Sequence, residues 1–403
     1  MPATALRCRI CETEFPLDPV GVCVRCFGPL EPVYAKDRVV TREQIEAGPP
    51  SIWRYAPLLP VAPPAEQRLA PGFTPLVTAP RLASAVGVGE LYLKLDTANP
   101  THSFKDRVVA VACATALEHG YTTLACSSTG NLANAVAARA AAEGIEAAVL
   151  VPADLEPEKL VATAVYGATI FAVNGTYDDC SRLSVELSFE LDWAFVNVEL
   201  RAYYAEGSKT LAFEIAEQLG WEFPDAVVAP IASGAMYSKV HKGFGELLEL
   251  GLVEGESPRV FGGQAEGCAP VAQAFADGAR VKPVKPNTIA RSIAIGSPAD
   301  GDLAVATANA SGGSIHAVPE EDIPENIKLL AETTGVFGET APATALGALR
   351  EAVRRGELGE QDRVVLLVTG DGLKTPALVA DRLEPVFVEP DADLILERLG
   401  VAV

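Results

Sequence analysis

The chain has 403 residues, of which 49% are hydrophobic and 21% are charged, so it is long enough for two or three globular domains. Its 53 acidic and 32 basic residues give a formal net charge of −21, which argues against nucleic acids and anionic membranes as partners, although a small anionic substrate stays open. No apolar run approaches the roughly 18 residues of a membrane helix, and no signal peptide is visible, so a cytoplasmic location is expected.

Two closely spaced cysteine pairs lie near the N-terminus, Cys8 with Cys11 and Cys23 with Cys26. Such pairs can supply four thiolates to one tetrahedral Zn²⁺, and a unit as small as residues 1–40 needs such a crosslink to fold. A redox disulfide pair is the alternative, but no thioredoxin-like pattern surrounds the cysteines. We therefore predict a zinc ribbon whose Zn²⁺ is structural, because four thiolates leave no open position for water.

A proline-rich connector over residues 48–80 is followed by strand-like apolar runs that alternate with alanine-rich helical stretches. The predicted strands are 91–95, 123–127, 147–151, 169–173, 194–198, 226–230, 259–263 and 364–369. The predicted helices are 106–119, 131–143, 156–166, 177–191, 206–219 and 235–248. This alternation predicts parallel-rich sheets with helices on both faces, which bind ligands at the carboxyl ends of their strands.

Lys105 lies in the sequence Ser103-Phe104-Lys105-Asp106-Arg107, where a predicted strand gives way to a long helix. A partly desolvated lysine amine at such a turn can condense with an aldehyde. An ordinary surface lysine in the first turn of a helix is the alternative, and the motif alone does not decide between them.

Three other strand ends carry small or polar residues. Hydroxyls and N–H groups of Ser127–Asn131 suit a carboxylate, although a plain helix cap is the alternative. The small residues of Pro230–Met236 allow backbone amides to approach a phosphate. A hydroxyl in Thr369–Lys374 can contact a ring nitrogen, although the segment also fits a tight turn.

Taken together, these motifs resemble the fold-type II pyridoxal-phosphate (PLP) enzymes over residues 72–380, and the threonine synthases most of all. The resemblance rests on Gly72–Leu76, Ser103–Arg107, Ser127–Asn131, Glu206–Thr210, Thr288–Gly296 and Thr369–Lys374. It implies an α/β fold of the tryptophan synthase β type, with two three-layer α/β/α domains after the ribbon. The implied ranges are 1–40 for the ribbon, 41–109 with 206–385 for the large PLP-binding domain, 110–205 for a smaller inserted domain, and 386–403 for a C-terminal extension.

The resemblance also implies which residues bind the cofactor. Lys105 forms the Schiff base with PLP and then moves protons, Asn131 bonds the phenolic oxygen of the ring, and Thr369 meets the pyridine nitrogen. The cofactor phosphate is held by backbone amides of Ala232, Ser233, Gly234, Ala235 and Met236.

The implied reaction converts O-phospho-L-homoserine and water to L-threonine and phosphate by γ-elimination and β-addition. Ser128 and Thr129 are implied to hold the substrate carboxylate. The candidates for its phosphate are Arg107, Arg201 and Lys209, and an equal alternative for Arg107 is a structural pairing with a carboxylate. The ribbon resembles the one that precedes the catalytic domain in some longer threonine synthases, and a homodimer is the expected assembly.

Three segments depart from the usual threonine synthase pattern: Leu132, residues 197–204 and residues 337–342. Because the family uses these regions for the substrate phosphate, a related PLP enzyme for β-replacement or elimination is the main alternative. It would act on phosphoserine like a cysteate synthase, or be a threonine or serine dehydratase. A non-catalytic binding protein and a nucleic-acid-binding zinc protein are further alternatives, opposed by the intact Lys105 motif and by the net charge respectively.

Overall fold

A computed structural model describes residues 3–128, 130–153, 157–382 and 384–399. Its largest sheet has six strands in the order β12-β11-β10-β13-β5-β4, and all neighbours are parallel except β4, which is antiparallel to β5. The strands are β4 (Leu76–Thr78), β5 (Glu90–Leu95), β10 (Ala226–Pro230), β11 (Arg259–Ala265), β12 (Ile315–Val318) and β13 (Arg363–Val368).

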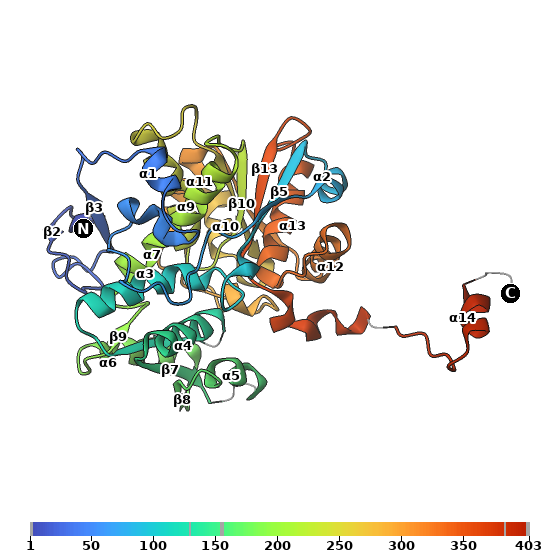
Figure 1. The fold of residues 1–403 in the computed structure, drawn as a ribbon, viewed down its shortest axis with the longest axis horizontal. Helices are drawn as coiled ribbons and strands as arrows, with labels where there is room; N and C mark the ends of the chain where they lie inside the picture. Colours follow the sequence, from blue (N-terminus) through green and yellow to red (C-terminus); the bar gives the residue numbers. More distant parts are fainter. Residues whose placement is uncertain (1–2, 129, 154–156, 383, 400–403) are drawn as a thin grey trace.

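Helices cover both faces of this sheet, as Figure 1 shows. One face packs against α2 (Pro80–Val86), α12 (Asp322–Thr334) and α13 (Thr340–Arg354). The other faces α8 (Lys209–Gln218), α9 (Ala235–Glu249), α10 (Pro270–Asp277) and α11 (Gly301–Ser311), with the short α1 (Arg42–Glu46) beyond them. The three-layer arrangement follows from the central strands β10 and β13, which are mostly apolar and buried and must be covered on both sides.

A second, four-stranded parallel sheet lies below the first in Figure 1. Its order is β8-β7-β6-β9, from β6 (Thr123–Ser127), β7 (Glu146–Pro152), β8 (Thr169–Val173) and β9 (Ala194–Phe195). Its helices are α4 (Asn131–Glu143), α5 (Pro157–Ala164) and α6 (Tyr177–Ser188). Two helices connect it with the larger sheet, α3 (Lys105–Glu118) and α7 (Arg201–Glu206).

The N-terminal segment forms a three-stranded antiparallel sheet in the order β2-β1-β3. Its strands are β1 (Ala3–Cys8), β2 (Glu14–Phe15) and β3 (Leu30–Tyr34). At the other end of the chain, α14 (Ala392–Arg398) lies at the tip of a segment that extends away from the body (Figure 1). Among the described residues, none of the helices combines the length and apolarity needed to cross a membrane.

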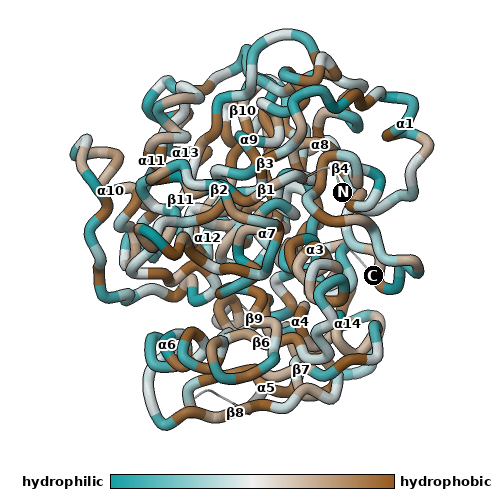
Figure 2. The backbone as a smooth tube through the Cα atoms, turned by 90° about the vertical axis from the view of Figure 1, so that its left-hand side faces the viewer, coloured by the Kyte–Doolittle hydropathy of each residue, from teal (hydrophilic) through white to brown (hydrophobic). Residues whose placement is uncertain are grey.

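The core joins these parts. One cluster of buried apolar residues includes Leu6 of the ribbon, Val109 of α3, Val149 of β7 and Val227 of β10. Hydrophobic segments accordingly gather in the interior around β10 and α9, and hydrophilic loops at the periphery (Figure 2). Because one continuous core runs through the ribbon and both sheets, the ribbon is packed as part of the body.

The predicted fold class is confirmed, and most predicted strands and helices match the observed ones within two residues. The predicted strand 194–198 is wrong in its second half: β9 ends at Phe195, where the N–H of Val198 turns back to the carbonyl of Phe195. The helix predicted at 206–219 is interrupted between α7 and α8. The domain boundaries at 40, 109, 205 and 385 stay a prediction, although each large sheet draws its strands from within one predicted domain.

Candidate active site

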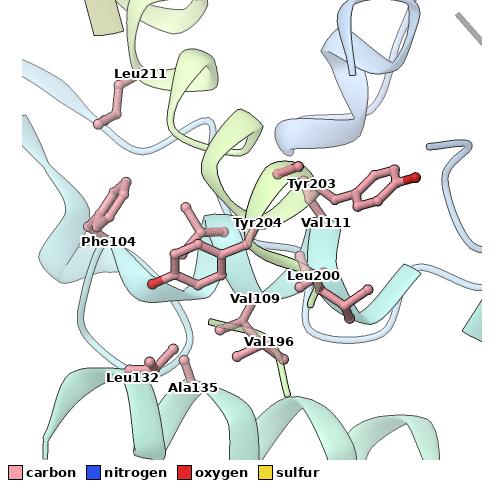
Figure 3. Packing of buried hydrophobic residues seen from close by; sticks show 14 of the residues in the cluster. Phe104, Val109, Val111, Leu132, Ala135, Val196, Leu200, Tyr203, Tyr204 and Leu211 are labelled. Carbon is pink, nitrogen blue, oxygen red and sulfur yellow. The ribbon is translucent and has the colours of Figure 1, made fainter. Parts of the chain in front are cut away.

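Lys105 begins α3, and the loop before it is pinned to the carboxyl end of β13. The N–H of Phe104 donates to the carbonyl of Thr369 at 2.9 Å, and Ser103 forms a β-bridge with Gly370. The half-buried amine of Lys105 donates to the hydroxyl of Tyr204 at 3.0 Å. Figure 3 shows the Tyr204 ring pointing toward Phe104, while the ring of Tyr203 points the opposite way. The amine is thus held at the junction of α3, α7 and β13.

Asn131, the first residue of α4, faces Glu339 and Lys374. Its Nδ2 donates to Oε1 of Glu339 at 2.8 Å, and its Oδ1 accepts from Nζ of Lys374 at 2.6 Å. Burial raises the pKa of Glu339 to about 7, although the charge of Lys374 and the Asn131 hydrogen bond oppose the shift. Burial also lowers the pKa of Lys374, although Glu339 opposes this. A carboxyl group with such a pKa can hold or give up a proton near neutral pH.

The sequence reasoning missed Glu339 and Lys374 as site residues. Glu339 lies in the divergent segment 337–342 and Lys374 ends the segment that begins at Thr369, so neither stands in a motif of its own. A signal for Glu339 existed, because a lone acidic residue beside a run of small residues is unusual for a buried segment.

The loop between β10 and α9 has the geometry of a phosphate cradle. Gly234 has a φ of +93°, and a Cβ there would lie 2.5 Å from the carbonyl oxygen of Asp300. Within the described part of the chain, the N–H groups of Ala232, Ser233 and Gly234 have no hydrogen-bond partner. Three open donors at the N-terminus of a 15-residue helix suit a bound phosphate. Ala235 and Met236, also predicted here, open that helix.

Thr369 directly follows β13 and is 8% exposed, next to the loop that carries Lys105. Two buried hydroxyl groups belong to residues close in sequence to Lys105 and Asn131, namely Ser103 and Ser127. Neither Oγ atom has a hydrogen-bond partner among the described residues. Orphaned buried hydroxyls call for a polar ligand. These groups, the open amides and the Lys105 amine together fit an aldehyde cofactor that carries a phosphate.

The predicted carboxylate-binding residues are only partly described. Ser128 is half-buried, and its Oγ accepts from the N–H of Gly130 at 3.3 Å. Thr129 lies outside the described residues. Their predicted role therefore stays a prediction.

Arg107 does not face a ligand, contrary to the prediction that it binds the substrate phosphate. Its side chain is fully buried, and its Nε and Nη2 donate to Asp96 at 2.8 Å. Its Nη1 and Nη2 also bond Glu214, and the remaining contacts are the hydroxyls of Thr74 and Thr210. All three nitrogens are used, so the alternative of a structural pairing with carboxylates holds.

Lys209 is likewise a structural residue, which corrects its prediction as a phosphate ligand. Its Nζ is fully buried and lies 2.6 Å from Glu206 and 2.9 Å from Glu246, and also donates to the carbonyl of Leu58. An ammonium group whose hydrogens are already shared among these buried acceptors has no donor left for a ligand.

Arg201 remains exposed enough to meet a ligand, with 29% of its side chain accessible. It begins α7, one turn before Tyr204, and its Nη2 lies 2.5 Å from Oδ2 of Asp300. Of the three candidate phosphate ligands, only Arg201 is partly exposed, and its role stays a prediction.

The four ribbon cysteines converge as predicted. Their sulfur atoms all lie within 4.8 Å of one another, with 3.4 Å between Cys8 and Cys26 and 3.6 Å between Cys11 and Cys23. A tetrahedral Zn²⁺ with bonds of about 2.3 Å would place its sulfur ligands roughly 3.8 Å apart. Backbone N–H groups also point to Cys8 and Cys23, as in metal-binding knuckles. The donor set thus fits Zn²⁺.

Comparison with known proteins agrees with this site. Residues 67–370 match the family described as pyridoxal-phosphate dependent enzyme. The threonine synthase of Methanosarcina acetivorans is 36% identical over 400 residues, and that of Methanocaldococcus jannaschii 35% identical over 401 residues, each alignment covering 98% of both chains. The Mycobacterium bovis threonine synthase is 36% identical and covers 83% of this chain and 91% of its own.

Solved structures show the same fold at lower identity. Diaminopropionate ammonia lyase from Escherichia coli has a TM-score of 0.67 at 19% identity, covering 85% of this chain and 93% of its own. Threonine deaminase isoform 2 from Solanum lycopersicum has a TM-score of 0.64 at 21% identity, covering 76% and 82%. With the full-length relatives, these matches lead to one conclusion: the chain belongs to the pyridoxal-phosphate dependent enzymes and, among them, to the threonine synthase family.

Proposed function

We propose that this protein is a threonine synthase, which uses PLP to convert O-phospho-L-homoserine and water to L-threonine and phosphate. The observation that carries the proposal is that the open amides, Thr369 and Lys105 follow the carboxyl ends of the neighbouring parallel strands β10, β13 and β5, in a chain that aligns with threonine synthases over 98% of its length. The family supports the cofactor, and the alignment supports the substrate.

Each residue then has a defined task. Bound PLP supplies a ring that withdraws electrons from the substrate carbons. Nζ of Lys105 removes and returns protons at Cα and Cβ, and the hydroxyl of Tyr204, 3.0 Å away, fixes the direction of that amine. The amides of Ala232 to Met236 would hold the cofactor phosphate, and Asn131 would hydrogen-bond the phenolic oxygen of the ring.

The substrate is held by its two charged ends. Ser128 and Thr129 bind its carboxylate at the start of α4, and Arg201 binds its phosphate. Arg201 suits this task because a guanidinium presents a planar set of donors to phosphate oxygens. The hydroxyl of Thr369 would serve as the partner of the ring nitrogen, and because it carries no negative charge it would leave that nitrogen less protonated and temper electron withdrawal.

Zn²⁺ in the ribbon is proposed to be structural, since Cys8, Cys11, Cys23 and Cys26 would fill all four positions of a tetrahedral shell. We further propose that the protein is a cytoplasmic homodimer. In each chain, the large domain is interrupted by the smaller domain at residues 110–205. Light scattering coupled to size exclusion tests the dimer.

The experiment for the reaction offers the purified protein O-phospho-L-homoserine, O-phospho-L-serine and L-threonine separately, and measures phosphate, threonine and keto acid. A threonine synthase releases phosphate and threonine in equal amounts from the first compound. Keto acid from threonine, or phosphate from phosphoserine alone, would identify the dehydratase or β-replacement alternative instead. Lys105→Ala should remove turnover and the visible absorbance band of the bound cofactor together.

A further inference from the structure

Arg9 connects the zinc ribbon with the catalytic body. It lies between Cys8 and Cys11, and its backbone N–H donates to the carbonyl of Pro29 at 3.0 Å, so both halves of the ribbon fix its position. Its side chain leaves the ribbon and forms an ion pair with Oδ1 of Asp300, 291 positions later in the chain. This contact is well shielded, since the two side chains are 20% and 7% exposed.

Asp300 precedes α11 but does not cap it with its side chain. An aspartate at this position commonly accepts hydrogen bonds from the first amides of its helix. Here the carboxylate instead gives one oxygen to Arg9 and the other to Arg201. Burial opposes ionisation, but the charges of Arg201 and Arg9 hold the pKa of Asp300 below its usual value. The carboxylate is therefore committed to the two guanidinium groups.

The backbone of Asp300 supports the phosphate cradle at the same time. Its N–H donates to the carbonyl of Ser233 at 2.9 Å, and its own carbonyl packs where Gly234 lacks a side chain. A single residue thus touches the ribbon, the candidate substrate ligand Arg201 and the loop with the open amides. Two cations on one carboxylate also leave one net positive charge beside that loop, which favours phosphate groups.

We propose that Arg9 is a positioning residue for phosphate recognition: through Asp300 it holds Arg201 and the Ser233–Gly234 loop in place, so the ribbon forms part of the active site. This inference rests on the proposed function, in which Arg201 binds the substrate phosphate. The side chain of Arg9 acts on Asp300 and does not itself react. Because Cys8 and Cys11 lie on either side of Arg9, a metal bound by them would act on the site by the same route.

The test compares Arg9→Ala and Arg9→Lys with a matched control, Arg7→Ala. Arg7 lies on the same ribbon in an exposed pair with Glu14, with the two side chains 49% and 51% accessible. Arg9→Ala should raise KM for O-phospho-L-homoserine and the inhibition constant of inorganic phosphate about tenfold, since a hydrogen bond between charged groups contributes that much. The kcat should stay within about threefold, Arg9→Lys should recover part of the loss, and Arg7→Ala should match the wild type.

A second measurement does not depend on turnover. The dissociation constant of PLP, followed by absorbance, should rise several-fold in Arg9→Ala and equally in the wild-type protein after chelation of its metal. Chelation should raise the dissociation constant of Arg9→Ala little further, because both changes break the same connection between the ribbon and Asp300. If the wild type fails to use phosphohomoserine, the proposed function falls, while this measurement still judges Arg9. Equal PLP affinity in Arg9→Ala and Arg7→Ala, or a loss in kcat with unchanged KM, would overturn the inference.

Discussion

Asn131 donates a hydrogen bond from Nδ2 to Oε1 of Glu339 across 2.8 Å, and this bond joins the two sheets. Asn131 opens α4 on the four-stranded sheet, whereas Glu339 directly precedes α13 on the six-stranded sheet. A Cβ at Gly370 would collide with the same carboxyl group, so Glu339 fits only because that position is glycine. The contact between the two sheets therefore includes a carboxyl group, that of Glu339, whose pKa is raised to about 7.

Glu339→Gln should change how stability depends on pH. Burial raises the pKa of Glu339 from 4.5 to about 7 in the folded protein, so folding favours the protonated form. The protonated carboxyl group therefore contributes its full share to the free energy of unfolding below pH about 4.5, and this share is lost as pH rises through about 7. Glutamine cannot ionise and keeps the acceptor for Asn131. In urea unfolding of the cofactor-free protein, the variant should gain stability relative to the wild type between pH 5 and roughly 8.

The control for this pH series is Glu332→Gln. In the wild type, the Glu332 side chain is 62% exposed and forms a surface ion pair with Lys328. The difference in free energy of unfolding between Glu332→Gln and the wild type should stay constant across the pH series. Parallel curves for the wild type and Glu339→Gln would mean that Glu339 has an ordinary pKa and is accessible to water.

How much of this site the sequence could predict depends on how local each signal is. Lys105 and Asn131 stand in short motifs at strand ends, so chain order alone locates them. Glu339 could not be paired with Asn131 because the two are 208 positions apart. Similarly, a motif that ends in Arg107 looks the same whether that side chain faces a ligand or Glu214, 107 positions away.

The fold follows the same rule. Strands of five or more apolar residues followed by long helices were predicted because their pattern is visible along the chain. The ribbon strands, β4, β12 and the helices α10 to α13 were not predicted. Of these, β2 and β4 have only two and three residues and show no clear alternation. β9 ends early because Glu199 accepts from the N–H of Phe195 and the chain turns.

Tyr204→Phe should slow the reaction without changing the fold. The substitution removes only the hydroxyl that accepts from Nζ of Lys105, and one such hydrogen bond contributes about 0.5–1.5 kcal/mol. We expect kcat/KM to fall roughly three- to tenfold, with the cofactor absorbance retained. Tyr203→Phe is the matched control, because that hydroxyl donates to the carbonyl of Asp18 in the ribbon. Equal rates in the two variants would remove Tyr204 from the site.

Arg107→Met should destabilise the protein strongly. The wild-type guanidinium lies between Asp96 and Glu214, and all three side chains are at most 1% exposed. Although burial raises the pKa of Glu214, the charges of Arg107 and Lys94 lower it to about 2. Removing the arginine leaves buried carboxylates without sufficient partners, which costs about 3–5 kcal/mol.

Denaturant unfolding measures this loss, with Arg182→Met as control. Arg182 forms a helical pair with Glu186 in which both side chains are 57% exposed, so its loss should cost roughly 0.5 kcal/mol or less. Similar losses in the two variants would show that the buried network contributes no more than a surface pair.

Metal content should follow the ribbon cysteines. The purified protein should contain about one Zn²⁺ per chain, and Cys11→Ser should lose most of it, because a hydroxyl is a poor replacement for a thiolate ligand. Cys11 is exposed, so its replacement leaves the hydrophobic core intact. Cys268→Ala, at a buried cysteine outside the ribbon, should keep the metal. Elemental analysis of the three proteins decides: equal zinc in all of them, or none in the wild type, contradicts a metal site formed by the four sulfur atoms.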